Sequence, residues 1–263
     1  MSILDVYVAR VHEYIDDMRG KGRSVTETDC PSSVGELLEG MPIRTGPGAS
    51  SGLILRGDTF VELGNPETGS CAFILWTDSM TPIRDGRVTL IGPDIHESPG
   101  ASLPFGQILI VGGAKLTEKD QEALDHSQYV ADRIEGYMIR SMPELIWSRI
   151  SREAAEKGFD LGLLGRALMA LFKTDVPKIE AMEIVFVTSD KEDLKPLEDI
   201  GTQVRKIAKS ILVENWKARG FDLYECTLGW DCNACPDRVV CDEIREFIQV
   251  RKSWDSDAGS IDD

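Results

Sequence analysis

The run Met182-Glu183-Ile184-Val185-Phe186-Val187 predicts a single strand late in the chain. Valine, isoleucine and phenylalanine favour extended backbone and pack well on a pleated surface. The segments before and after this run place apolar residues at helical spacing instead. A strand that returns after helices favours an α+β fold, in which a mixed sheet is packed by helices.

The first half of the chain supplies the other predicted strands. Over residues 41–113, short apolar runs are separated by glycine, proline, asparagine and aspartate, a pattern typical of strands joined by turns. Turns are predicted at 56–58 and 65–69, and Asp85-Gly86 resembles the turn of a hairpin. The candidate strands are 52–56, 58–63, 71–76, 87–91 and 107–111.

An amphipathic helix is predicted at the N-terminus. Residues 2–19 place apolar side chains on one face at helical spacing, and Gly20 and Gly22 end this helix. A polar linker is expected over 23–33.

More helices are predicted after residue 113. Thr117 with Asp120, and Ser189 with Glu192, resemble the capping boxes that begin helices. These helices are expected over 118–140, 143–157, 160–173, 197–218 and 241–252.

The predicted elements suggest how the chain is organised. Its last residues are acidic and contain few apolar side chains, so we expect a disordered tail. The expected regions are an N-terminal helix and linker (1–36), an α+β domain (37–196), a helix with a small cysteine-rich iron–sulfur lobe (197–252) and the tail (253–263).

The charge and hydropathy of the chain exclude some classes of partner. The 263 residues carry 29 basic and 45 acidic side chains, for a net charge of −16. Such a surface repels nucleic-acid backbones and anionic lipid, so we expect neither as a partner. We find no apolar run of about 20 residues and no signal peptide pattern. A cytoplasmic location, where cysteines are usually reduced, is therefore expected.

Four cysteines near the C-terminus are the strongest functional signal in the sequence. Cys226, Cys232, Cys235 and Cys241 lie within sixteen residues, with the spacing C-x5-C-x2-C-x5-C. A [4Fe–4S] cluster takes one thiolate per iron, and proline also follows a ligand cysteine in ferredoxins, as Pro236 does here. These four cysteines therefore predict a [4Fe–4S] cluster.

Two other interpretations of the segment stay open. A structural zinc site usually pairs two C-x2-C knuckles across a longer interval, and only one knuckle is present here. Disulfides or unmodified thiols are the second alternative. Trp230 is expected to shield a cluster from water. Elsewhere, Cys71 begins an apolar strand and is expected to be a core residue, while Cys30 lies in the polar linker.

Residues from about 41 to 189 resemble the middle domain of CO-methylating acetyl-CoA synthase, the beta subunit of the carbon monoxide dehydrogenase/acetyl-CoA synthase complex. The order and spacing of several segments carry this resemblance. They are Gly57-Asp58-Thr59-Phe60-Val61-Glu62-Leu63-Gly64, Asp85-Gly86-Arg87-Val88-Thr89-Leu90-Ile91-Gly92-Pro93-Asp94, Leu103-Pro104-Phe105-Gly106, Ile146-Trp147-Ser148-Arg149-Ile150-Ser151 and Ala155-Glu156-Lys157-Gly158-Phe159.

The resemblance continues into the cysteine segment and then departs. Residues 224–228, Tyr-Glu-Cys-Thr-Leu, look like the start of the nickel–iron–sulfur site of that family. The family has a cysteine where this chain has Gly229, and it holds nickel with a later Cys-Gly-Cys. No Cys-x-Cys occurs in this sequence. The four clustered cysteines would thus be used for the iron–sulfur cube alone.

The resemblance also implies a site for coenzyme A, which that family associates with arginines and a tryptophan of the middle domain. The candidates in this chain are Trp147, Arg149, Arg152 and Arg140, with Arg133 nearby. Arginine suits phosphates because it donates bidentate hydrogen bonds. The alternative is that Trp147 packs in the core and the arginines offset an acidic surface.

Three functions follow from these patterns. The first is an iron–sulfur protein with a redox or accessory role in anaerobic one-carbon metabolism. Its partners would be a corrinoid protein, a methyltransferase or carbon monoxide dehydrogenase. The second is an acetyl-CoA synthase-like transferase that acts on coenzyme A. The third is a scaffold whose metal only stabilises the C-terminal lobe.

Overall fold

The structure is a computed structural model, and it describes residues 4–49, 52–114, 117, 119–120, 123–124, 133–142 and 145–218. The chain falls into two units, Met1–Arg205 and Lys206–Asp263. In the second unit the described residues are 206–218, the C-terminal part of one long helix. All described strands lie in the first unit.

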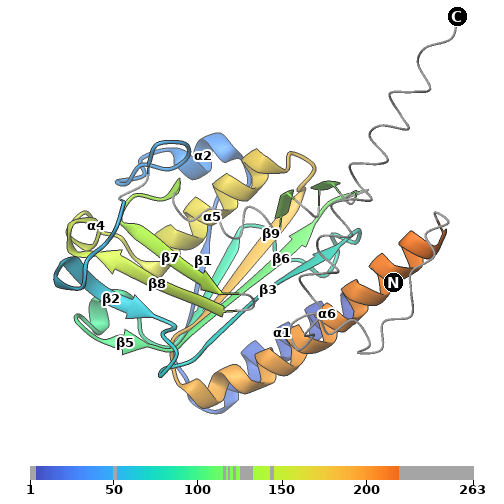
Figure 1. The fold of residues 1–263 in the computed structure, drawn as a ribbon, viewed down its shortest axis with the longest axis horizontal. Coiled ribbons are helices and arrows are strands. Elements are labelled where there is room, and N and C mark those ends of the chain that lie inside the picture. The colour runs from blue at the N-terminus through green and yellow to red at the C-terminus, as the bar shows by residue number, and fades with distance from the viewer. Residues whose placement is uncertain are drawn as a thin grey trace, which may run out of the picture. The chain divides into compact units, whose positions relative to one another are not determined.

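A five-stranded mixed sheet is the centre of the first unit (Figure 1). The late strand predicted from the sequence, β9, lies in the middle of it. It runs parallel to β4 on one side and antiparallel to β6 on the other, and all seven of its residues are buried. In spatial order the strands are β1 (Val25–Asp29), β4 (Arg87–Ile91), β9 (Ala181–Val187), β6 (Phe105–Gly112) and β3 (Ser70–Thr77).

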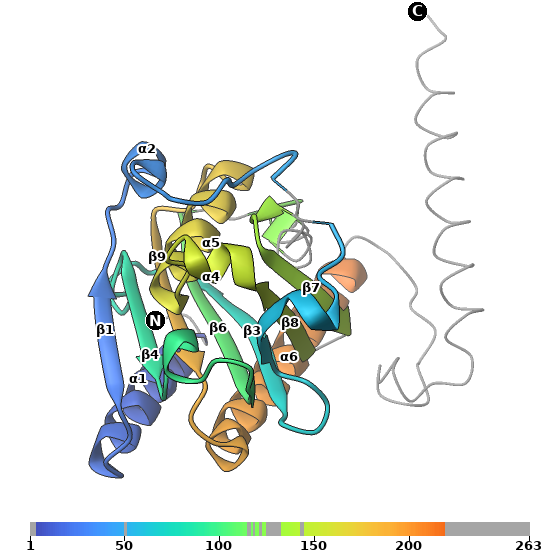
Figure 2. The same cartoon turned by 90° about the vertical axis from the view of Figure 1, so that its left-hand side faces the viewer.

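A second, four-stranded mixed sheet packs against one face of the first (Figure 2). Its strands in spatial order are β5 (Ser102–Leu103), β2 (Thr59–Leu63), β8 (Leu145–Ser151) and β7 (Tyr137–Met142). Side chains from both sheets share one hydrophobic core. The α+β class is therefore confirmed, with two mixed sheets where one was predicted.

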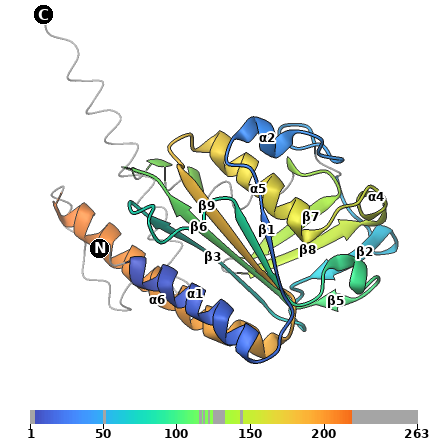
Figure 3. The same cartoon turned by 180° about the vertical axis from the view of Figure 1, so that it is seen from behind.

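Helices cover both faces of the five-stranded sheet (Figure 3). On one face lie α1 (Asp5–Gly20) and the part of α6 (Lys191–Ala218) that belongs to the first unit. On the other lies α5 (Leu161–Asp175), whose apolar residues join the core shared by the two sheets. The short helical elements are α2 (Val34–Leu38), η1 (Arg56–Asp58), η2 (Ile95–Glu97) and α4 (Arg152–Glu156).

The alternation of β9 decides which of its side chains meet which helix. Met182, Ile184 and Phe186 belong to the core shared with α5 and the second sheet. Because successive side chains of a strand point to opposite faces, Glu183 faces α1 instead. A carboxylate is thus buried on the central strand of the sheet.

Two predicted helices are wrong where the structure has strands. The end of the predicted helix 118–140 forms part of β7, and most of the predicted helix 143–157 forms β8 followed by the short α4. In β8, buried Ile146, Ser148 and Ile150 alternate with more exposed residues. This period of two is the signal of a strand, and the two strands pair antiparallel to each other.

The polar linker predicted over 23–33 is also wrong in part, because it contains β1. That strand carries only one partly buried residue, Val25, so no apolar run marks it. It pairs antiparallel with β4. The turn at Asp85-Gly86 forms, with Gly86 at a φ of 76°, but it joins no hairpin, since β3 pairs with β6.

Two smaller predictions also differ from the structure. Residues 52–55, predicted as a strand, pair with none of the described strands, and 56–58 form a helical turn. Ser189 forms no capping box with Glu192, because its hydroxyl donates to the carboxylate of Asp193, 2.6 Å away. The predicted pair of Thr117 and Asp120 does form.

Candidate functional site

Trp147 and Arg149 lie on β8, where they approach the neighbouring strand β2. The register places Glu62 of β2 opposite Arg149, and Arg149 Nε donates to Glu62 Oε1 over 2.9 Å. A second bond runs from Arg149 Nη1 to the carbonyl oxygen of Ile54, at 3.3 Å. The Arg149 guanidinium also lies 5.9 Å from the centre of the Trp147 ring. Ionic and aromatic contacts therefore hold Arg149 in place.

The carboxylate of Glu62 stays ionised in this arrangement. Burial raises its pKa, but hydrogen bonds from Asn65 and Arg149 and the positive charge of Arg149 outweigh that effect and hold the pKa below its usual range. The charge of Arg149 is therefore already neutralised within the protein. Arg140 pairs through its backbone with Trp147 across the β7–β8 ladder, and its side chain falls outside the described side chains.

Arg152 lies at the start of α4 and faces a hollow of about 590 Å³. Its Nε donates to the carbonyl oxygen of Gly57 over 3.3 Å, and among the described residues it forms no ion pair. We call this feature the acidic hollow. It is lined by Arg44, Leu53, Ile54, Asp58, Glu135, Gly136, Ser151, Arg152, Glu153, Ala154 and Glu156.

The acidic hollow contains more carboxylates than arginines. Glu135 is the best supported of them, because Lys157 Nζ donates to it over 2.8 Å and the backbone N–H of Arg44 does so over 2.9 Å. The hydrogen bond from Lys157 is the largest cause that lowers the pKa of Glu135 to about 2. At neutral pH the hollow therefore has a net negative charge, which disfavours a phosphate group.

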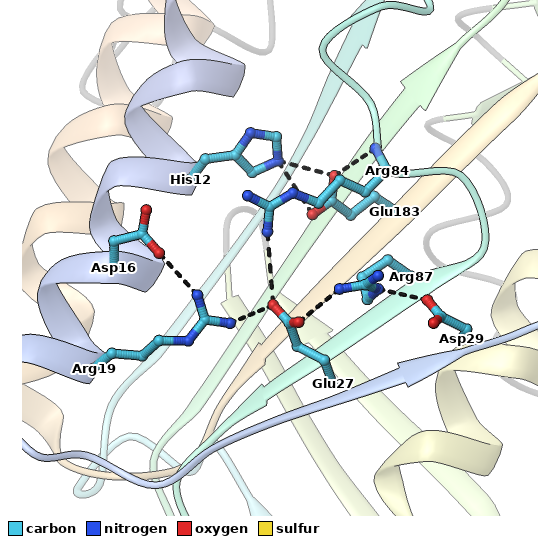
Figure 4. Close-up of polar contacts among 8 residues, drawn as sticks. All are labelled: His12, Asp16, Arg19, Glu27, Asp29, Arg84, Arg87 and Glu183. Carbon is cyan, nitrogen blue, oxygen red and sulfur yellow. Dashed lines mark hydrogen bonds and ion pairs between the residues drawn. The ribbon is translucent and has the colours of Figure 1, made fainter.

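A second polar cluster, between α1 and the five-stranded sheet, was not predicted from the sequence (Figure 4). Glu183 of β9 has a fully buried side chain, and both of its oxygens lie near His12 Nε2, at 2.9 and 3.2 Å. The backbone N–H of Arg84 donates to the same carboxylate over 3.0 Å. A charged residue inside the apolar run 182–187 was the one signal that could have indicated this site.

Beside this pair, Glu27 of β1 gathers three arginines (Figure 4). Arg87 donates to it over 2.6 Å, Arg19 bonds its other oxygen, and Arg84 lies 3.6 Å away. Arg87 also binds Asp29. These contacts fasten α1 and β1 to the sheet, and the arginines of the cluster are used within the fold.

The four predicted cluster ligands, Cys226, Cys232, Cys235 and Cys241, lie outside the described residues. Within the part of the chain that is described, no group of three or more histidine, cysteine or acidic side chains is placed to hold a metal ion. Cys71 is buried in β3, which confirms its prediction as a core residue. No helix among the described residues has the length and apolar character needed to cross a membrane.

The fold and its clusters define a two-sheet α+β domain, and comparison with known proteins places that domain in a family. The profile of CdhC, the CO dehydrogenase/acetyl-CoA synthase complex beta subunit, matches residues 41–194. The chain belongs to this family. The match runs from before β2 to the start of α6, and it confirms the resemblance seen in the sequence.

Individual relatives agree with this assignment. The beta 1 subunit of the acetyl-CoA decarbonylase/synthase complex of Methanosarcina thermophila is 30% identical over 231 residues, covering 83% of this chain and 46% of the relative. The corresponding beta subunit of Archaeoglobus fulgidus is 32% identical over 231 residues, covering 82% and 43%. This chain thus spans less than half the length of these curated relatives.

Proposed function

We propose that this chain is an iron–sulfur protein of the CdhC family with a redox or accessory role in anaerobic one-carbon metabolism. One observation carries the proposal, namely four cysteines within sixteen residues in a chain that has no Cys-x-Cys. The names of its relatives refer to an acetyl-CoA decarbonylase/synthase complex. A corrinoid protein, a methyltransferase or carbon monoxide dehydrogenase would then be its partner.

The chemistry of the cysteines fits a [4Fe–4S] cluster. Cys226, Cys232, Cys235 and Cys241 would provide one thiolate per iron, and a bound cluster would accept and release single electrons. The described fold offers no competing set of ligands. Cys71 is enclosed in the core, so it would remain a structural residue after the cluster binds.

Metal and sulfide analysis of anaerobically purified protein tests this proposal. We expect about four irons and about four sulfides per chain, no nickel, and an S = 1/2 signal after reduction with dithionite. A Cys232→Ser/Cys235→Ser variant should lose the iron. The matched control is Cys30→Ser, which removes a half-buried thiol outside the segment and should keep it. Zinc without sulfide would contradict the proposal.

A second candidate is an acetyl-CoA synthase-like transferase that binds coenzyme A. The exposed Arg152 favours it, because its guanidinium forms no ion pair among the described residues. The carboxylates around Arg152 oppose it. Stoichiometric nickel, together with coenzyme A binding that Arg152→Ala weakens, would support this candidate over the first. Trp147, Arg149 and Arg140 remain its other predicted contacts.

The third candidate is a scaffold in which the metal only stabilises the C-terminal lobe. Replacing the cluster with a redox-inert metal separates it from the first. If partner function persists after the replacement, the scaffold is supported. If the fold persists but electron transfer is lost, the redox role is supported.

A further inference from the structure

Three charged side chains at the acidic hollow have no ion-pair partner among the described residues. They are Asp58, Glu156 and Arg152, whereas Glu135 and Glu153 are both bound by Lys157. An isolated surface charge is ordinary, but Asp58 and Glu156 share this hollow with a single unpaired cation, Arg152, so one negative charge is left over among the three unpaired side chains. A cationic group that enters the hollow would meet both carboxylates.

The backbone holds these carboxylates on well-defined elements. Asp58 ends the helical turn η1, where its N–H donates to the carbonyl oxygen of Leu55 over 3.1 Å. Glu156 ends α4, whose first turn is capped by Ser151 Oγ, which accepts from Ala154 N at 3.1 Å. Ordered charges lose less entropy on binding than charges on flexible loops do.

Two leucines next to the hollow are unusually exposed. Leu53 is 67% exposed and Leu55 is 56% exposed, the highest values for large apolar side chains among the described residues. Ile54 between them is buried, and its N–H and carbonyl oxygen contact Met138 and Arg149. The exposures therefore place Leu53 and Leu55 at the surface on either side of an inward-facing Ile54.

We propose that the acidic hollow is a docking site for a segment of a partner protein that carries a basic side chain next to an apolar one. The basic side chain would approach Asp58 and Glu156, and the apolar side chain would cover Leu53 and Leu55. The volume of the hollow is within the range of roughly 300–1,000 Å³ found for binding pockets. The proposal rests on the accessory role proposed for the chain, because it names the surface that a partner would use.

Charge complementarity favours a separate basic partner over a second copy of this chain. A chain of net charge −16 repels itself, most of all where acidic surfaces would meet. It also argues against nucleotides and other phosphate compounds, which carry the same sign as the hollow.

Peptide titration of the isotopically labelled full-length chain tests the docking site. The probe is the acetylated tripeptide amide Leu-Arg-Leu, and the readout is the amide proton–nitrogen correlation spectrum. We expect a dissociation constant of about 1 mM, with shifts confined to 52–58 and 152–156. The same peptide with glutamate in place of arginine should bind at least about threefold more weakly.

Matched variants separate this site from nonspecific attraction to an acidic protein. Asp58→Asn/Glu156→Gln should weaken binding by about threefold to tenfold. Glu192→Gln/Glu198→Gln changes the net charge equally on the exposed side of α6 and should have no effect. Leu53→Ser/Leu55→Ser should weaken binding of the Leu-Arg-Leu peptide but not of a Gly-Arg-Gly peptide.

Several outcomes would overturn the proposal. They are the absence of shifts at about 10 mM peptide, tighter binding of the acidic peptide, and equal effects of the two charge-neutralising variants. A concentration-dependent dimer that Asp58→Asn/Glu156→Gln abolishes would identify a second copy as the occupant instead. Iron analysis of the same samples reports on the proposed function separately, so either proposal can fail alone.

Discussion

Replacing His12 alone with leucine should destabilise the fold more than replacing both His12 and Glu183 with leucine. Glu183 is fully buried on the central strand, and His12 is the side chain that holds its carboxylate. Without His12, the N–H of Arg84 would be the one close donor left to the carboxylate among the described residues. A buried charge without its partner costs far more than a pair of apolar side chains in the same place.

The burial of His12 and Glu183 sets the expected loss in the free energy of unfolding. Removing one partner of a buried, hydrogen-bonded carboxylate costs about 3–5 kcal/mol, and we expect about 3 kcal/mol for His12→Leu because the His12 side chain is 16% exposed. The double variant has no buried charge. Among the described residues it leaves one donor, the N–H of Arg84, without its acceptor, which costs about 1–2 kcal/mol. The double variant should therefore be more stable than the single one by about 1–2 kcal/mol.

Urea unfolding at pH 7, followed by circular dichroism, measures these differences. Hydrogen exchange of the α1 amides reports whether the loss is local to that helix. Asp16→Asn is the control, because Asp16 is 65% exposed in its pair with Arg19 and should cost less than about 1 kcal/mol. A double variant that is less stable than His12→Leu would refute the reasoning, because the pair would then stabilise the fold more than apolar packing does.

Three further predictions concern the second sheet and its surroundings. Glu135 has its pKa lowered from 4.5 to about 2, chiefly by Lys157. Its stabilising effect should therefore be present above pH 4.5 and lost as the pH falls towards 2, and Glu135→Gln should flatten this part of a plot of Tm against pH. Gly64→Ala should destabilise by more than about 3 kcal/mol in urea unfolding, because φ is 69° and the added Cβ would lie 2.2 Å from a β8 carbonyl oxygen. Gly158→Ala, with φ of 87° and open space around it, should cost only about 1 kcal/mol. Arg149→Ala should raise the pKa of Glu62, the residue opposite it on β2, which carbon NMR can measure. An unchanged pKa would contradict the assigned ion pair.

The strands that sequence reasoning found are those with continuous apolar runs. β9 and β6 are buried on both faces, so nearly every residue in them is apolar and the run is visible without knowledge of the fold. β1 was missed because it has one partly buried residue. β8 was missed because its alternation is short and lies between helical patterns, where seven residues fit either period.

The candidate sites also differ in how far they can be predicted from the sequence. The four cysteines are close in sequence, so their spacing alone indicates a shared ligand. The acidic hollow joins Arg44, Asp58, Glu135 and Glu156, which are far apart in the chain, and no local pattern brings them together. The pairing of Arg149 with Glu62 likewise depends on the register of β8 against β2. Such contacts follow from topology, which one sequence does not reveal.

The position of β9 has a consequence for how this protein is made. Its neighbours β4 and β6 precede it by nearly one hundred and by about seventy to eighty residues. Until β9 leaves the ribosome, both strands have an open edge with no partner, and such edges invite pairing between nascent chains. Long sequence separation also slows folding. The central strand therefore completes the sheet last during synthesis. A chain that stalls before residue 181 would keep these open strand edges, and chaperones would have to shield them from aggregation.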